Sequence, residues 1–199
     1  MAEQFIRESF DNYLTGKKDY QLKISNHIRL LNVFSNEVFE NADSGAREDV
    51  IKKIQSDDYE QQNPASFKTA LEQSKHTLML SNYTEQDFAK MKLFKLNGYN
   101  IGFALKQRDG EQAHDEIVTL FNNEPGVKGI GDILVQSAVK NGGRYLDHFD
   151  GFLSDLYKNN NFVQYNRKKY NPDYDEEGKF KQQYGESDVI YRKYDDNQK

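Results

Sequence analysis

The sequence predicts an α+β fold that is preceded by an extra helical segment. Three observations support this prediction. Apolar residues recur at helical spacing through much of residues 1–60. The pair Asn97-Gly98 lies between two apolar runs and is a strong signal for a β-hairpin. Residues 117–165 then read as strand, glycine-bearing loop, helix, strand, helix and strand.

The composition restricts the classes of partner. The 199 residues carry a net charge of −5 and a pI near 5.5, which argues against a nucleic-acid partner or an anionic membrane surface. No run approaches the roughly 20 apolar residues of a membrane span, and the N-terminus does not resemble a signal peptide. We therefore expect a cytoplasmic protein. The chain has no cysteine, and its four histidines lack metal-ligand spacing, so we expect no metal site.

A polar break divides the chain into two parts. The run Gln61-Gln62-Asn63-Pro64 ends the first helical pattern. The sequence therefore predicts a helical N-terminal segment over residues 1–63 and an α/β domain over residues 64–199. Ser66 is expected to cap the first helix of the second part. The N-terminal helices are the expected contact for a homo-oligomer or a protein partner.

The elements of the second part follow from local signals. Thr84 and Asp87 have the spacing of a capping box, and Asn161 suits a left-handed helix end. Strands are expected at 76–80, 92–96, 99–105, 117–121, 144–149, 162–165 and 188–192, and helices at 132–140 and 150–160.

The loop from Pro125 to Leu134 lies between a strand and a helix. Its glycines allow successive N–H groups to point into one concavity, and the helix N-terminus adds a partial positive charge. A pyrophosphate fits such a site, with Lys128 as a mobile cation at its edge. The Gly-Lys-Ser/Thr end of a Walker loop is absent, and the glycines are spaced in the reverse of the dinucleotide fingerprint. The alternative is an ordinary turn that uses glycine for geometry.

Two segments at a fixed separation resemble one family. The run Gly126-Val127-Lys128-Gly129-Ile130-Gly131 occupies the position of the phosphate-loop signature of GNAT-type N-acyltransferases. The run from Asp150 to Phe162, with Leu156-Tyr157 inside it, keeps the spacing of that family's second signature. The resemblance covers about residues 76–165 and the last strand near Val189. It implies a mixed, mostly antiparallel central sheet flanked by helices.

The resemblance also implies a chemistry, in which an acetyl group passes from acetyl-CoA to an acceptor amine. Tyr157 would protonate the leaving thiolate, and a carboxylate or histidine would take the proton of the amine. Glu116 is the candidate base, with His114, Asp147 and His148 as alternatives. The residues that would bind the cofactor are Leu120, Phe121 and Asn122 at a splayed strand edge, and Val127, Lys128, Gly129, Ile130, Gly131 and Asp132 through their backbone N–H groups.

Departures from the family pattern keep a second function class open. Gly126 stands where the family has Arg or Gln, Asp150 replaces Asn, Leu153 replaces a small residue and Asn161 replaces Gly. The alternative is a non-catalytic GNAT-like structural or host-interaction protein. The sequence also resembles phage-encoded proteins, which would place it in the host cytoplasm. A third alternative is an oligomer driven by the helical segment, with the α/β part as a scaffold.

Overall fold

The computed structural model describes most of the chain beyond residue 44. The described residues are 45–60, 62–74, 82–108, 114–151, 153–175 and 178–197. Contacts between residues divide the chain into two compact units, Met1–Gly45 and Ala46–Lys199. The helices expected in residues 1–44 and the strand expected at 76–80 lie outside the described residues.

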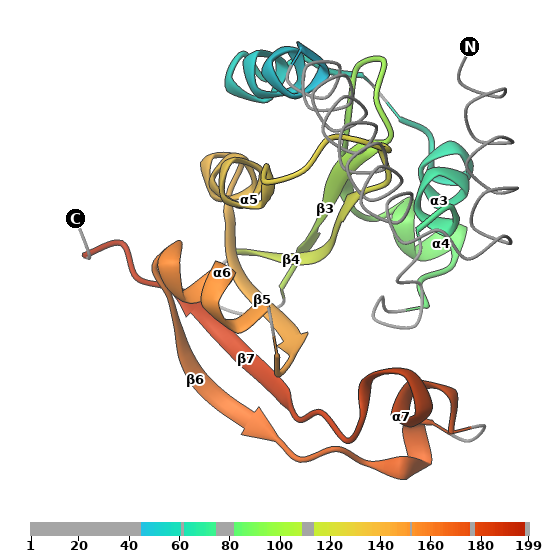
Figure 1. Cartoon of the computed structure of the whole chain (residues 1–199), viewed down its shortest axis with the longest axis vertical. Helices are drawn as coiled ribbons and strands as arrows, with labels where there is room; N and C mark the ends of the chain where they lie inside the picture. Colours follow the sequence, from blue (N-terminus) through green and yellow to red (C-terminus); the bar gives the residue numbers. More distant parts are fainter. Residues whose placement is uncertain are drawn as a thin grey trace, which may run out of the picture. The chain divides into compact units, whose positions relative to one another are not determined.

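The second unit is built on a seven-stranded sheet, which confirms the α+β prediction and its mostly antiparallel pairing (Figure 1). The strand order is β1-β2-β3-β4-β5-β7-β6. Only the β4–β5 pair is parallel among the strand pairs of the described residues. The strands are β1 (Tyr59–Glu60), β2 (Lys92–Leu96), β3 (Ile101–Gln107), β4 (Asp115–Asn122), β5 (Gly143–Phe149), β6 (Phe162–Lys168) and β7 (Val189–Tyr194).

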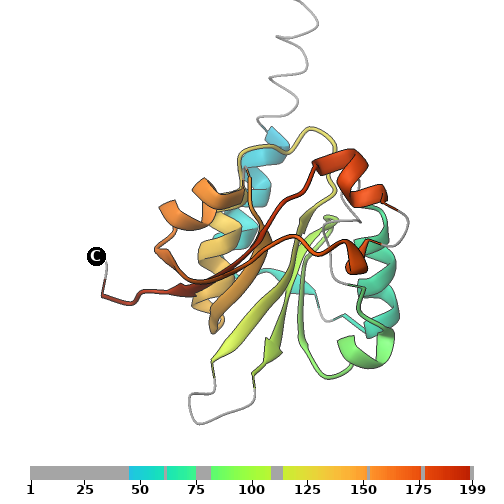
Figure 2. The ribbon, with the colours of Figure 1, turned by 90° about the horizontal axis from the view of Figure 1, so that it is seen from below.

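Helices cover both faces of the sheet (Figure 2). Residues 45–55 are helical, and the named helices are α3 (Pro64–Glu72), α4 (Glu85–Phe88), α5 (Gly131–Lys140), α6 (Leu153–Asn159) and α7 (Lys179–Tyr184), with a 3₁₀ turn η2 at Pro172–Tyr174. On one face the helix of residues 45–55, α5 and α6 build the main core. Its members include Val50, Leu134, Leu146 and Tyr157.

On the other face α3 and α4 pack over β3 and β4 and form a second core. Phe67 of α3 and Phe88 of α4 are fully buried there, and the centroids of their rings lie 5.3 Å apart. Phe121 of β4 joins them, with its ring 5.6 Å from that of Phe67. Burial of these aromatic side chains supplies much of the apolar area that holds α3 to the sheet.

Several local signals act as the sequence predicts. Gly98 has φ +79° in the turn between β2 and β3, and Thr84 and Asp87 form the capping box of α4. Asn161 has φ +63° at the end of α6. The prediction that Ser66 caps α3 is wrong, because Asn63 is the cap and its side chain accepts the N–H of Ser66 at 2.8 Å. Pro64 fits the first helical turn, since its missing N–H would have no helical partner there.

The helix of residues 45–55 belongs with the sheet. Val50 and Ile54 are 0% and 2% exposed within the main core. Tyr59 of β1 follows this helix, and the centroid of its ring lies 5.6 Å from those of the Phe94 and Phe103 rings. The compact unit therefore begins near Ala46, whereas the sequence suggested a boundary at residue 63.

Candidate active site

The parallel strands β4 and β5 separate part-way along their length. Their pairing ends at Ile117 opposite Leu146. Beyond that point, within the part of the chain that the structure describes, β4 pairs only with β3 as far as Asn122, and β5 only with β7 as far as Phe149. Residues 118–122 and 147–149 therefore face each other without a ladder, and we call this opening the fork. Among the described strands, none pairs with the backbone N–H and C=O groups on the two inner edges of the fork, which leaves these groups for a ligand.

Side chains on the β4 edge of the fork divide between the two cores. Leu120 is half-buried against the main core, whereas Phe121 is 3% exposed in the second core. The side chain of Phe121 is thus committed to packing, and only its backbone lies at the fork. The hydroxyl of Thr119 is buried without a hydrogen-bond partner among the described residues.

The glycine-bearing loop leads from β4 into α5 and is held by its own side chains. Asn122 Nδ2 donates to the carbonyl of Val127 at 2.6 Å, and Asn122 Oδ1 accepts the N–H of Glu124 at 3.1 Å. Gly126 and Gly129 have φ of +86° and +67°, a region that other residues enter only with strain. The side chains of Val127 and Ile130 are buried, so these two residues offer a ligand only their backbone.

The N-terminus of α5 has unused hydrogen-bond donors. Its N-cap is Ile130, which provides no side-chain acceptor. Among the described residues, none accepts the N–H groups of Gly131, Asp132 or Ile133. The carboxylate of Asp132 stands in the first turn and accepts a 2.6 Å hydrogen bond from Asn160 Nδ2.

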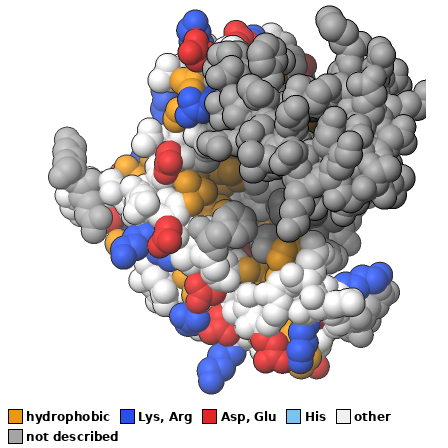
Figure 3. Space-filling view, in the orientation of Figure 1, with side chains coloured by type: hydrophobic (Ala, Val, Ile, Leu, Met, Phe, Trp, Pro, Cys, Tyr) orange, Lys and Arg blue, Asp and Glu red, His pale blue; other side chains and the backbone are white. Residues whose placement is uncertain are grey.

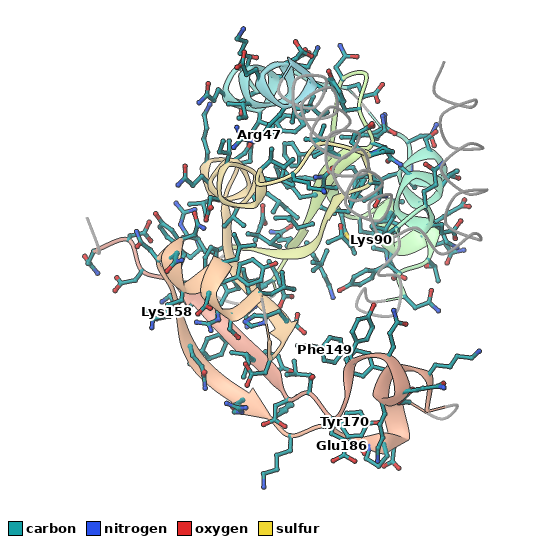
Figure 4. The ribbon with its side chains drawn as sticks, viewed as in Figure 1. Arg47, Lys90, Phe149, Lys158, Tyr170 and Glu186 are labelled. Carbon is teal, nitrogen blue, oxygen red and sulfur yellow. The ribbon has the colours of Figure 1, made fainter. Side chains whose placement is uncertain are left out.

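Arg47 is a cation at this loop that sequence reasoning missed. Its Nε donates to the carbonyl of Lys128 at 3.0 Å, and its Nη2 approaches the carbonyl of Gly129 at 3.4 Å. Figure 4 shows Arg47 between the helix of residues 45–55 and α5. No local signal reveals this residue, because it lies more than 80 positions from the loop and its helix was assigned to another segment.

Tyr157 of α6 lies in the main core beside β5. It is 6% exposed, and its ring lies 5.1 Å from the ring of His148. Burial, with a smaller contribution from Asp147, raises the pKa of Tyr157 to about 12. The phenol is therefore protonated at neutral pH, as a proton donor requires.

His148 is not free to act as a base. Its Nε2 accepts from Arg192 Nε at 2.9 Å, so its Nδ1 carries the proton that bonds the carbonyl of Phe149 at 2.7 Å. Arg192 also donates to the carbonyl of Phe162 at 2.9 Å. Burial first, and then the charge of Arg192, lowers the pKa of His148. Both ring nitrogens are thus occupied in the neutral form.

Glu116 and Asp147 flank the point where β4 and β5 separate. Their neighbours Ile117 and Leu146 point into the main core, so these two carboxylates point to the opposite face of the sheet. Burial and then the charge of Asp147 raise the pKa of Glu116. Burial also raises the pKa of Asp147, although this side chain keeps solvent contact and its desolvation is partial. His114 is exposed just before β4.

Of the expected site residues, Leu120, Phe121 and Asn122 lie on the β4 edge of the fork, and Glu116 lies just before it. Tyr157 lies on the α6 side and Glu116 on the opposite face, while Lys128 to Asp132 lie at the α5 end of the loop. Three pockets lined wholly by described residues lie elsewhere, near Arg167, near Asn160 and near Gln55. Within the described part, no group of three or more His, Cys, Asp or Glu side chains is placed to hold a metal.

None of the helices in the described part combines the length and the apolar character needed to cross a membrane. On the described part of the face seen in Figure 3, acidic and basic side chains are interspersed. Comparison with protein-family models, with curated proteins and with solved structures yields no match for this chain.

Proposed function

We propose that this chain is a GNAT-like N-acyltransferase that transfers an acetyl group from acetyl-CoA to an amine. The observation that carries the proposal is the β4–β5 fork, followed directly by a glycine-bearing loop and the uncapped start of α5. Unpaired strand edges suit the amide groups of an extended pantetheine arm. Orphan N–H groups and the helix dipole suit a pyrophosphate.

Cations near the loop support the same assignment. Gly126 leaves the loop without the basic residue of the family pattern, but Arg47 and the exposed Lys128 both lie beside it. The guanidinium of Arg47 uses Nε and Nη2 on the loop carbonyls, so its remaining N–H donors can reach an anion. Arg47 therefore takes the role that Gly126 cannot fill.

The transfer divides its proton steps between the two faces of the sheet. The neutral amine attacks the thioester carbonyl, a C–N bond forms, and the C–S bond breaks. Glu116 takes the proton that the amine loses, and Tyr157 gives its proton to the departing thiolate. A backbone N–H at the β4 edge of the fork stabilises the tetrahedral oxyanion. Glu116 and Tyr157 then exchange protons with solvent to reset the site.

Acetyl-CoA binding tests the donor site directly. Ligand at about 100-fold above its Kd should raise the free energy of unfolding by about 2.7 kcal/mol, measured as a thermal shift. Arg47→Ala should weaken binding roughly tenfold, because it removes a charge-assisted contact worth about 1–2 kcal/mol. Lys52→Ala is the matched control, since Lys52 is exposed on the same helix. The donor site is refuted if wild type shows no shift at millimolar acetyl-CoA, and the role of Arg47 is refuted if both variants bind alike.

Turnover of an amine acceptor tests the two proton-transfer residues. Tyr157→Phe and Glu116→Gln should each lower kcat by about 10²-fold or more while acetyl-CoA affinity holds. The base must be ionised to act, and burial raises the pKa of Glu116. Activity should therefore fall as pH drops through a pKa above the ordinary value for glutamate. A variant that retains wild-type kcat removes its residue from the mechanism.

A second candidate is a non-catalytic GNAT-like structural or host-interaction protein. Two observations favour it. The carboxylate of Asp132 stands at the start of α5, where it would repel the pyrophosphate of acetyl-CoA. The side chain of Tyr157 is almost fully buried, which limits its access to a leaving thiolate. The Asp132→Asn variant separates the alternatives. If acetyl-CoA binds neither the wild type nor this variant, the non-catalytic role is the better account.

A further inference from the structure

The face of the sheet opposite α5 and α6 carries tyrosines and cations over β5, β6 and β7. Leu146 and Arg192 are buried on the α6 side, so Tyr145 and its partner Lys193 point to the other side. The helices on that side, α3 and α4, pack over β3 and β4. Among the described residues, no helix covers the middle of β5–β7 on this face; α7 touches only its end, where Phe180 meets Phe149 at 4.1 Å.

The tyrosine rings form a chain across three strands. The centroid of the Tyr165 ring on β6 lies 6.1 Å from that of Tyr145 on β5 and 6.3 Å from that of Tyr191 on β7. Both ring pairs are edge to face. Tyr165 is 50% exposed, and Val163 on the same strand is 40% exposed. Tyr and Arg are enriched where proteins contact one another.

Three cations stand over these rings. The guanidinium of Arg108 lies 3.9 Å from the centre of the Tyr145 ring, and Lys193 Nζ lies 5.8 Å from it. Lys168 Nζ lies 5.2 Å from the centre of the Tyr191 ring. Within the described part, none of the three makes a salt bridge. We call this set the tyrosine–cation face: Tyr145, Tyr165, Tyr191, Arg108, Lys168 and Lys193.

The two carboxylates of the fork lie on the same face. Glu116 is opposite Tyr145 in the β4–β5 register, and Asp147 is opposite Tyr191 in the β5–β7 register. Burial is the main cause that raises the pKa of Tyr165. The charge of Arg108 lowers this pKa, whereas the charges of Glu116 and Asp147 raise it further. Negative charge at the fork is thus bordered by positive charge on β6 and β7.

From this arrangement we infer that the acceptor is a protein segment in which a lysine is flanked by acidic residues. The inference rests on the proposed function. The lysine ammonium is attracted to Glu116 and Asp147 at the fork, while the flanking carboxylates meet Arg108, Lys168 and Lys193. A face across three strands that no described helix covers suits a segment of chain, whereas small ligands prefer enclosed pockets. A polycationic segment would be repelled by the same three cations.

Binding of two short peptides without acetyl-CoA tests the inference. The first peptide carries a lysine with two acidic residues, one Asp and one Glu, on each side. The second peptide carries Arg in place of these four acidic residues. Fluorescence anisotropy at low salt should give at least about tenfold tighter binding of the acidic peptide. The double variant Lys168→Glu, Lys193→Glu should lose this preference. Lys158→Glu is the control, because Lys158 is exposed on α6, on the other side of the sheet (Figure 4).

Three outcomes overturn the inference. The first is equal binding of the two peptides, and the second is an unchanged preference for the acidic peptide in the double variant. The third is binding of phosphoethanolamine as tight as that of the acidic peptide, because this would indicate a small acceptor. The proposed function is judged separately by the acetyl-CoA thermal shift. If acetyl-CoA gives a thermal shift but the two peptides bind alike, only the proposed acceptor is refuted. If the acidic peptide is preferred but acetyl-CoA gives no thermal shift, the face is a docking surface and the transferase is refuted.

Discussion

At the scale of single residues, Arg192 and His148 illustrate how burial fixes a protonation state. Arg192 is 7% exposed, and no carboxylate among the described residues lies in hydrogen-bond contact with it. A buried guanidinium needs acceptors, and His148 Nε2 is one of them. Protonating His148 would remove that acceptor and place a second cation beside the first.

The pH dependence of stability follows from this pair. The pKa of His148 is lowered in the folded state, so the unfolded chain takes up the proton first as pH falls. The free energy of unfolding should therefore decrease below about pH 6.5. Urea unfolding at pH 7.5 and 5.5 measures this. His148→Gln should reduce the decrease, and His114→Gln, at an exposed site, should not. Equal pH dependence in the two variants contradicts this assignment.

Removing the arginine should cost stability at pH 7.5, where His148 is neutral and accepts from it. Arg192→Leu leaves His148 Nε2 and the carbonyl of Phe162 without their partner, which costs about 1–3 kcal/mol per unsatisfied buried group. The measurement is the urea midpoint at pH 7.5. An unchanged midpoint would mean that water replaces the guanidinium.

At the scale of elements, the β2–β3 hairpin depends on a close approach of two strands. A side chain at Gly102 would overlap the carbonyl oxygen of Phe94 on β2 and approach the Phe121 ring at 3.1 Å. Gly102→Ala should therefore cost about 1–3 kcal/mol, because backbone atoms must move. In Gly131→Ala the nearest atom is Leu156 Cδ1 at 3.2 Å, the end of a side chain, so the loss should be smaller. Thermal unfolding compares the two, and an equal loss would contradict the argument.

Elements with strong local chemistry were predictable. The capping box of Thr84, the Asn97-Gly98 turn and the glycine-bearing loop all act within a few residues, so their signals are complete in the sequence. The cap of α3 was placed wrongly at Ser66, because Asn63 and Ser66 are both capping residues and only the observed Asn63 contact decides between them.

At the scale of the whole molecule, the two cores connect distant parts of the chain. The helix of residues 45–55 supplies Val50 and Ile54 to the same core as α5 and α6. A chain that starts at residue 46 should keep cooperative unfolding. One that starts at residue 64 should lose about 3–6 kcal/mol, because each of these two side chains contributes roughly 1.5–3 kcal/mol when buried. Differential scanning calorimetry of both chains tests this, and equal stability would support the boundary that the sequence predicts at residue 63.

The candidate site needed the whole molecule as well. The sequence nominates Tyr157 and the loop residues through their resemblance to the family signatures, and Glu116 because it precedes the strand expected at 117–121. Arg47 was missed, since only the packing of its helix against α5 brings it to Lys128. Arg192, 44 positions away in the chain, donates to His148 Nε2 and so prevents His148 from acting as the base.

The sequence by itself determined the α+β class, most element positions and the glycine-bearing loop, because propensity, capping and turn chemistry act over short distances. Tertiary structure decided where β4 and β5 separate, which face each side chain occupies, and which cation stands at the loop. These depend on strand register and on contacts between residues far apart in the chain. The placement of β7 between β5 and β6, which brings Tyr191 and Lys193 beside the fork, is such a feature.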